Sequence, residues 1–267
     1  MMCAVLVLLA NFSTGQDLSN RFKTGQIIIY HVDQESLATD IMGENSSSVK
    51  NRTRVTKEWK VVDLDGNNIA TIEMRLLALV VETTRPNGEI LKFDSNKPEG
   101  PLKDSLAPLV GSTVAKLNVD RLGRVLEVTD SKFGKPTRYE TEPPFVAVLH
   151  GQKVVPGQTW NRNYFAVLEP PAGTGEKIEL IQNYITRSLE KDKVILDLET
   201  SSLKPFKNPV EEASILQLMP KGTINFDLQR GLMTSAHLTI DKVINEIAGS
   251  GSSYQFKSTY KEILVDK

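Results

Sequence analysis

The three histidines of the chain, His31, His150 and His237, are the first residues to consider for metal binding or acid–base chemistry. They lie in separate segments, and no two have the i,i+2 or i,i+4 spacing that places two imidazoles on one ion. His31 and His237 fall within strand-like alternation, and His150 stands beside Gly151. The sequence therefore predicts no metal site, and predicts surface or hydrogen-bonded histidines instead.

No serine lies in the Gly-x-Ser-x-Gly pattern of a nucleophile elbow. Gly249-Ser-Gly-Ser-Ser253 separates two predicted strands, so we interpret it as a hairpin loop. Pro170–Lys177 contains two glycines but lacks the spacing of a phosphate-binding loop, and it precedes a strand and not a helix. We predict neither catalytic residues nor a cofactor.

The carboxylates are better explained by turns than by chemistry. Asp63-Leu-Asp65-Gly-Asn67 is similar to the start of a calcium loop, but Met74 stands where a bidentate glutamate would be needed. Asp120 and Asp227 each lead into a glycine turn, where an aspartate can accept backbone hydrogen bonds. A hydrolase site assembled only in three dimensions remains an alternative.

Composition excludes several classes of protein. The chain has 267 residues, and its 32 Lys and Arg balance 33 Asp and Glu, so a nucleic-acid partner is not expected. No apolar run reaches the roughly 20 residues that span a bilayer, so we predict no transmembrane anchor.

Residues 1–15 have the character of a secretory signal peptide. Ala4–Ala10 has the length of a signal h-region, and small residues precede a cleavage site before Gln16. No basic residue precedes the apolar run, so a buried amino-terminal strand or an upstream start codon stays open. Removal of this segment would remove Cys3, the only cysteine, and leave a mature chain without disulfides. We expect an extracytoplasmic protein, periplasmic or secreted.

Most of the remaining chain alternates with a period of two, which is typical of strands. Strands are predicted over 27–32, 53–62, 69–83, 89–93, 114–120, 125–129, 160–168, 177–189, 193–201, 222–228, 232–244 and 253–265, and short helices over 103–110 and 210–219. One face of the third strand is expected to carry Ala70, Ile72, Met74, Leu76, Ala78 and Val80.

The order of these elements repeats. Each half begins with a Gly-Gln pair, at 25–26 and 157–158, and later carries an apolar-Asn-apolar-Asp strand, Leu117–Asp120 and Ile224–Asp227. These matches suggest duplication of one β-rich unit, although such short patterns also arise by chance. We divide the chain into a signal peptide (1–15), a first β-rich half (16–130), a connection (131–156) and a second β-rich half (157–267).

Three motifs of the chain resemble those of an uncharacterised family of exported bacterial β-rich proteins, a domain of unknown function. They are Arg21-Phe-Lys-Thr-Gly-Gln26 with Tyr30, Pro156-Gly-Gln-Thr-Trp160, and Leu117-Asn-Val-Asp-x-x-Gly-Arg-Val-Leu126. The motifs consist of turn and strand-start residues, so the resemblance implies a fold and export but no catalytic residues. The missing basic residues at the start of the signal are where this chain departs from the family.

We therefore predict a mainly β protein of long, twisted antiparallel strands. Its two related halves form a half-barrel or open barrel, with one short helix in each half, because long alternating strands need one face covered and their edges protected. At the level of architecture this resembles half-barrel envelope carriers that hold acyl chains in their concavity.

The predicted function is that of a non-catalytic cell-envelope protein whose concave face binds a hydrophobic small molecule, a lipid or a partner segment. The residues suggested to contact such a ligand are Trp59, Met74, Leu76, Tyr184, Phe226, Tyr254 and Phe256. Each of them is also the type of residue that forms an ordinary core. A structural or surface-assembly protein without a pocket is the main alternative.

Overall fold

Strands dominate the computed structural model, which describes residues 16–132, 135–168 and 174–265. The strands are β1 (Ile27–Met42), β2 (Asn45–Leu64), β3 (Ala70–Thr84), β4 (Ile90–Asp94), β5 (Thr113–Val119), β6 (Val125–Ser131), β7 (Thr159–Leu168), β8 (Glu176–Glu190), β9 (Lys193–Ser202), β10 (Lys221–Asp227), β11 (Leu232–Asn245) and β12 (Ser252–Leu264). The helices are α1 (Lys103–Leu106), α2 (Thr137–Thr141) and α3 (Pro209–Ile215), with 3₁₀ turns η1 (Ala107–Leu109) and η2 (Leu216–Leu218). The predicted signal peptide lies outside the described residues.

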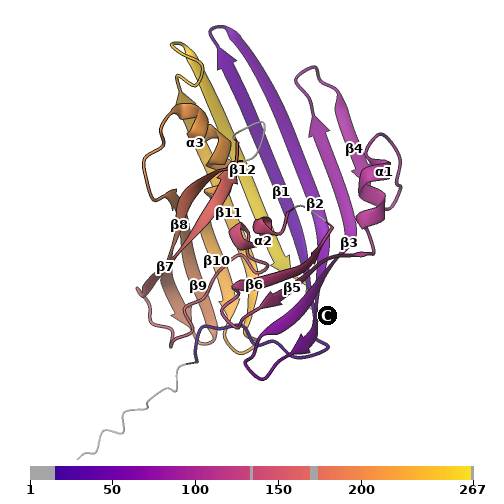
Figure 1. Ribbon diagram of the computed structural model, residues 1–267, viewed down its shortest axis with the longest axis vertical. Coiled ribbons are helices and arrows are strands. Elements are labelled where there is room, and N and C mark those ends of the chain that lie inside the picture. Colours follow the sequence, from indigo (N-terminus) through magenta and orange to yellow (C-terminus); the bar gives the residue numbers. More distant parts are fainter. Residues whose placement is uncertain (1–15, 133–134, 169–173, 266–267) are drawn as a thin grey trace, which may run out of the picture.

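The twelve strands of the described residues belong to one sheet, in the order β6-β5-β3-β2-β1-β12-β11-β10-β9-β8-β7, with β4 paired to β3 (Figure 1). Every pairing between named strands is antiparallel. The path ends at β6 and β7, so these strands curve without closing into a barrel. The predicted mainly β, open antiparallel architecture is confirmed.

The halves meet at the long β1–β12 pair, which joins the first strand of the chain to the last. Each half runs through three strands, a short helix and two more strands: β1, β2, β3, α1–η1, β5, β6 in one, and β7, β8, β9, α3–η2, β10, β11 in the other. The short hairpin strand β4 is added in the first half and β12 in the second. The suggested duplication stays a prediction, since a shared element order can arise without one.

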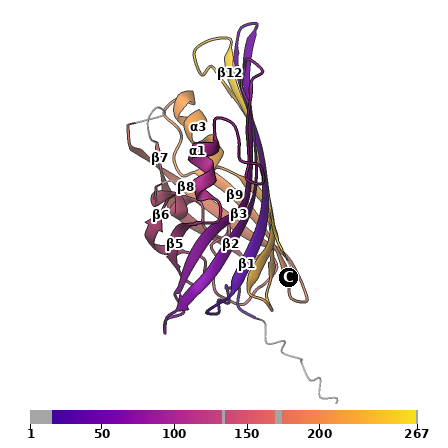
Figure 2. The ribbon, with the colours of Figure 1, turned by 90° about the vertical axis from the view of Figure 1, so that its right-hand side faces the viewer.

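The two faces of the sheet differ in polarity, as the alternation predicts. In β1, Ile28, Tyr30 and Val32 are buried on the concave face, and His31 between them is exposed on the convex face. Figure 2 shows α1 and α3 on the concave side of the curved sheet. The convex face carries ion pairs such as that of Arg52 with Asp33.

Three details differ from the sequence prediction. The β1–β2 hairpin continues to Met42 and Asn45, because backbone pairing extends through a polar stretch that lacks apolar alternation. In β3, a register shift beside Leu76 places Leu79 in the core, so the prediction that Ala78 and Val80 continue the apolar face is wrong. Helix α2 was not predicted, because its five residues carry no helical period.

The two predicted helices are present, and each covers part of the concave face. Leu106 and Leu109 of α1–η1 pack against the main core, whereas Leu216 of η2 packs with Ile240 and Ile244 of β11. Asn208 caps the start of α3: its side chain accepts a hydrogen bond from the Glu211 amide, which satisfies one free N–H of the first turn.

The segment that follows α2 fills one end of the concavity. The Phe145 ring lies 5.5 Å from Phe22, 6.4 Å from Tyr30 and 5.8 Å from Trp59, measured between ring centroids.

Among the described residues, no helix has the length and apolar character needed to cross a bilayer.

Candidate functional site

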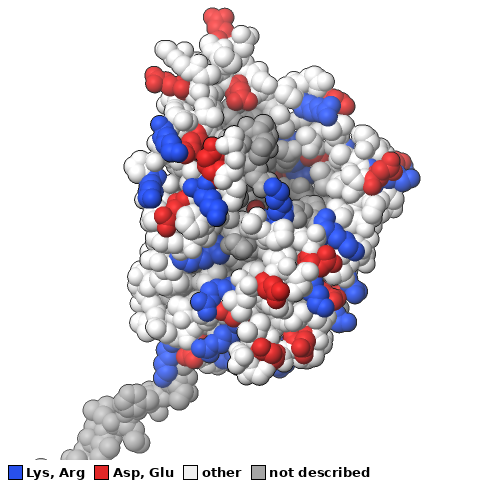
Figure 3. Space-filling view, in the orientation of Figure 1, with Lys and Arg blue, Asp and Glu red and all other residues white. Residues whose placement is uncertain are grey.

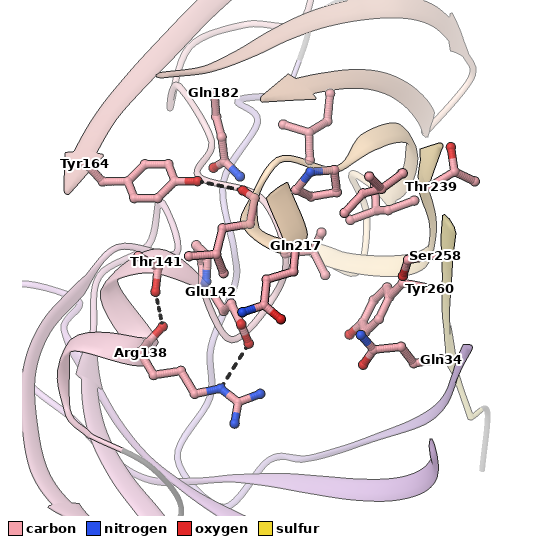
Figure 4. Close-up of a pocket in the computed structure, with 17 residues that line it drawn as sticks. Gln34, Arg138, Thr141, Glu142, Tyr164, Gln182, Gln217, Thr239, Ser258 and Tyr260 are labelled. Atoms are coloured by element: carbon pink, nitrogen blue, oxygen red, sulfur yellow. Dashed lines mark hydrogen bonds and ion pairs between the residues drawn. The ribbon is translucent and has the colours of Figure 1, made fainter. Parts of the chain in front are cut away.

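A cavity of about 160 Å³ opens on the concave face, next to the filled end. Figure 3 shows this face hollowed near its centre, and Figure 4 shows the cavity in close-up. Its lining comes from both halves of the sheet and from the covering segments: Gln34, Arg138, Thr141, Glu142, Pro143, Val146, Tyr164, Gln182, Leu198, Gln217, Leu218, Pro220, Leu238, Thr239, Ile240, Ser258 and Tyr260. A cavity of this size is comparable to one that holds a single benzene ring.

The cavity changes character from mouth to floor. Gln34 and Gln217 are exposed at its mouth, where the charges of Arg138 and Glu142 pair at 3.1 Å between Nε and Oε2. Deeper residues, among them Leu198 and Leu238, are buried and apolar. An amphiphile would therefore meet polar groups first and apolar side chains below them.

Gln182 is the polar exception among the deep residues. Its side chain is only 4% exposed, and its Oε1 accepts two hydrogen bonds of 2.8 Å, from Arg162 Nε and from the Tyr184 hydroxyl. Burial raises the pKa of Tyr184, which keeps this hydroxyl protonated and able to donate. Because both partners donate to the oxygen, the orientation of the amide is fixed and its nitrogen faces the cavity (Figure 4).

Arg162 is itself held in place by its neighbours. Its Nη2 donates to the carbonyl of Thr141 at 2.9 Å, and its guanidinium lies 4.5 Å from the centroid of the Tyr164 ring. The Tyr164 hydroxyl in turn donates to the Leu218 carbonyl at 3.3 Å. These contacts connect β7 to α2 and η2, so the wall of the cavity is built by tertiary contacts across three elements.

A buried ion pair lies behind the cavity, at the junction of the halves. Lys57 Nζ is 2.7 Å from Glu262 Oε1, and the Glu262 side chain has no exposed surface. The Tyr260 hydroxyl donates to the other carboxylate oxygen. Burial and then the Glu262 carboxylate raise the pKa of Tyr260 well above its ordinary value. The Tyr260 ring lines the cavity, and its hydroxyl is occupied by this network.

The seven residues that the sequence suggested for ligand contact lie outside this cavity, and none is part of its lining. Trp59, Met74, Leu76, Tyr184 and Phe226 are each at most 8% exposed and belong to the main core. Tyr254 and Phe256 stack at 6.4 Å on the concave face beside η2. A direct contact of any of the seven with a ligand stays a prediction.

The three histidines lie in two different surroundings. His31 and His237 are exposed on the convex face, where His31 Nδ1 is 2.9 Å from Thr56 Oγ1. His150 lies edge-on to Trp160, with ring centroids 4.6 Å apart. Within the part of the chain that the structure describes, no three His, Cys, Asp or Glu residues gather in a way that could hold a metal ion.

The polar residues of the cavity were not predicted, because they are neither reactive groups with a catalytic spacing nor large apolar side chains. A usable signal was present, however. Gln182 stands between buried Leu180 and Tyr184 on one face of β8, and Ser258 stands between Phe256 and Tyr260 on β12. A polar residue that interrupts an apolar face of a strand indicates a site where the core is not closed.

Comparisons with known proteins give a fold likeness and no family. No family model matches the chain, and no curated protein matches it. The chain is similar to lipovitellin, in a structure that concerns lipid–protein interactions, with a TM-score of 0.52 and 10% sequence identity. The match covers 92% of this chain and 26% of that one, so the chain spans about a quarter of lipovitellin. The likeness shows the fold alone.

Two other solved structures match over most of this chain, but with low scores. They are DynF from the dynemicin biosynthesis pathway of Micromonospora chersina, with 8% identity, a TM-score of 0.22 and coverage of 94% of this chain and 85% of that one, and an outer membrane channel from Pseudomonas putida F1, with 8% identity, a TM-score of 0.22 and coverage of 92% and 97%. These scores are too low to support a shared fold.

Proposed function

We propose that this protein is a non-catalytic, extracytoplasmic envelope protein that binds a hydrophobic or amphiphilic small molecule in the cavity of its concave face. The observation that carries the proposal is the cavity itself, where buried Leu198 and Leu238 lie below polar side chains at the mouth. An apolar pocket with a few polar groups is the usual form of a small-molecule site.

Two further observations support the proposal. The fold is similar to lipovitellin, whose structure concerns lipid–protein interactions. The sequence resembles a family of exported bacterial proteins, and residues 1–15 have the pattern of a signal peptide. Both export and membership of that family are part of the proposal.

The experiment is a titration of the purified full chain, freed of co-purified molecules by solvent extraction and refolding, with methyl hexanoate, followed by NMR. The variant Ser258→Trp places an indole into the cavity, because Ser258 is half-buried in its lining. We expect Ser258→Trp to bind methyl hexanoate at least tenfold more weakly than the natural chain. A matched control, Ser253→Trp, changes the same strand on the convex face, since the two positions differ by an odd number of residues.

The proposal is contradicted if the natural chain does not bind methyl hexanoate, or if both tryptophan variants bind it equally well. Mass spectrometry of the solvent extract gives an independent result. An apolar molecule that co-purifies with the natural chain and with Ser253→Trp, but not with Ser258→Trp, supports the cavity as its site.

A further inference from the structure

We infer that the cavity selects ligands that carry a carbonyl or carboxylate oxygen next to an apolar chain, and that the Gln182 amide donates the hydrogen bond that recognises this oxygen. This inference rests on the proposed function and names the chemical class of the ligand. Its starting point is that Gln182 presents an N–H donor inside the cavity, and that a ligand with an acceptor oxygen could complete the hydrogen bonding of this amide.

The orientation of the Gln182 amide decides whether the cavity meets its oxygen, which accepts hydrogen bonds, or its nitrogen, which donates them. Arg162 has only donors, so its Nε can bond to the amide of Gln182 only through Oε1. The Tyr184 hydroxyl accepts from the backbone N–H of Val148 at 3.3 Å and gives its own proton to the same Oε1. A rotation of the amide by 180° would place two N–H groups against the Arg162 guanidinium, which electrostatics opposes. The cavity therefore receives the N–H₂ end.

The nitrogen makes no hydrogen bond to any of the described residues, although Gln182 is 96% removed from solvent. The open cavity leaves this nitrogen accessible, so a ligand oxygen placed against it can accept its hydrogen bond. A hydrogen bond inside a low-dielectric interior is stronger than one in water. A ligand without an acceptor would gain only from contact with the apolar lining.

The neighbours of Gln182 specify the rest of the ligand. Leu198, Leu238 and Ile240 line the same cavity, and each is at most 8% exposed. They fit the alkyl carbons that follow a carbonyl group. The cavity holds about 160 Å³, which accommodates a short chain or one ring, so a longer chain must extend through the mouth past Gln34 and Gln217.

The test compares three probes of equal chain length by NMR titration of the full chain: methyl hexanoate, hexanoate and hexane. The first two carry the acceptor oxygen, uncharged in the ester and charged in the carboxylate, and hexane has none. We expect the ester or the carboxylate to bind at least tenfold more tightly than hexane. We also expect the probe that binds to shift the side-chain amide protons of Gln182 downfield.

Two variants remove the donor and differ in what they leave for Arg162 and Tyr184. Gln182→Glu keeps an oxygen for both partners but places an acceptor where the N–H₂ was. Gln182→Met keeps the length of the side chain but removes the donor and also the oxygen that accepts from Arg162 and Tyr184, so Gln182→Glu is the decisive variant. Both are expected to bind the preferred probe at least tenfold more weakly and hexane within threefold of the natural chain. Gln255→Glu, on the convex face of β12, is the matched control and should change neither.

The outcomes separate the inference from the proposed function. If Ser258→Trp abolishes binding but the Gln182 variants bind all probes as the natural chain does, the cavity is a binding site and the role of Gln182 is wrong. If the natural chain binds hexane as tightly as the ester and the carboxylate, the selection for an acceptor oxygen is wrong. If no probe binds, both fail. A larger loss for the ester than for the carboxylate, or the reverse, identifies which source of the oxygen the cavity favours.

Discussion

The two halves of the sheet share an order of elements but bury different side chains on the concave face. In the first half, Leu76, Leu79 and Leu117 lie buried in an apolar core under α1–η1. In the strands of the second half, Gln182, Thr186, Thr200 and Glu262 are also buried. One topology therefore supports an apolar core in one half and buried polar side chains in the strands of the other. If this difference is functional, stability and binding can be changed separately.

The largest effect on stability without an effect on binding is expected from Phe93→Ala in the first half, whose core is apolar. Phe93 on β4 is 1% exposed, and its truncation is expected to cost about 3–5 kcal/mol of the free energy of unfolding, because the cavity left behind is not refilled. Urea denaturation measures this loss. Ile90→Ala on the same strand, at a position 59% exposed, should change stability by less than about 0.5 kcal/mol. Weaker binding of methyl hexanoate by folded Phe93→Ala would contradict the division of roles.

The junction between the halves is tested by Lys57→Met, which leaves Glu262 buried without its cation. Removal of one partner of a buried ion pair typically costs about 3–5 kcal/mol, and the part-exposed position of Lys57 places the expected loss near 3 kcal/mol. The double variant Lys57→Met/Glu262→Leu should recover most of this loss in the same denaturation experiment. Lys261→Met, on the convex face, should have little effect. Equal losses for both single lysine variants would mean that the pair does not stabilise the junction.

The two halves also differ at one small residue. In the register of the repeated motif, Gly222 of β10 corresponds to Ala115 of β5. A Cβ at Gly222 would lie 2.1 Å from the His237 carbonyl oxygen and 2.9 Å from Leu238 Cα. Gly222→Ala should therefore destabilise the protein by about 2–3 kcal/mol, because backbone must move. Ala115→Gly should cost only about 1 kcal/mol. Thermal unfolding of the two variants compares the halves directly. A larger loss of stability in Ala115→Gly than in Gly222→Ala would contradict this prediction.

The smallest effect is expected from pH. Burial lowers the pKa of His150, so the folded state favours the neutral ring that accepts a hydrogen bond from the Gln152 amide at 3.0 Å. This stabilisation is complete above the unfolded pKa of about 6.5 and is lost as the pH falls through the lower, folded value. The loss should be below about 1 kcal/mol, since the ring is only partly buried. The melting temperature between pH 7 and pH 5 should fall less in His150→Asn, and an identical fall in both proteins would contradict this assignment.

Period-two alternation predicted most of the strands to within one or two residues, as in β9 and β11. The alternation failed to predict strand residues in two places, where the pattern of polar and apolar residues does not reflect how the strands pair. The β1–β2 hairpin beyond Val32 carries mostly polar residues on both faces, and only its long backbone ladder makes it a pair of strands. The shift beside Leu76 has no signature in the sequence, because a bulge moves alternation by one residue without changing the residue types.

The candidate site was less predictable than the fold. The seven residues predicted to contact a ligand are large apolar or aromatic side chains, and five of them are packed in the main core, Trp59 and Phe226 among them. Whether an apolar side chain faces a cavity or a neighbour depends on how completely the opposite layer covers it. That layer includes α2, which no local pattern predicts, and η2, whose place over the sheet depends on tertiary packing.

By itself, the sequence determined the β architecture, the two short helices and the difference in polarity between the faces, because alternation and turn residues act over a few positions along the chain. Only the tertiary structure decided that Arg162 and Tyr184 turn the Gln182 amide nitrogen toward an open volume, and that Lys57 meets Glu262 from 205 positions away in the chain. Hydrogen-bond direction and packing completeness depend on residues that are distant in sequence, so they become defined only when the sheet curves and brings those residues together.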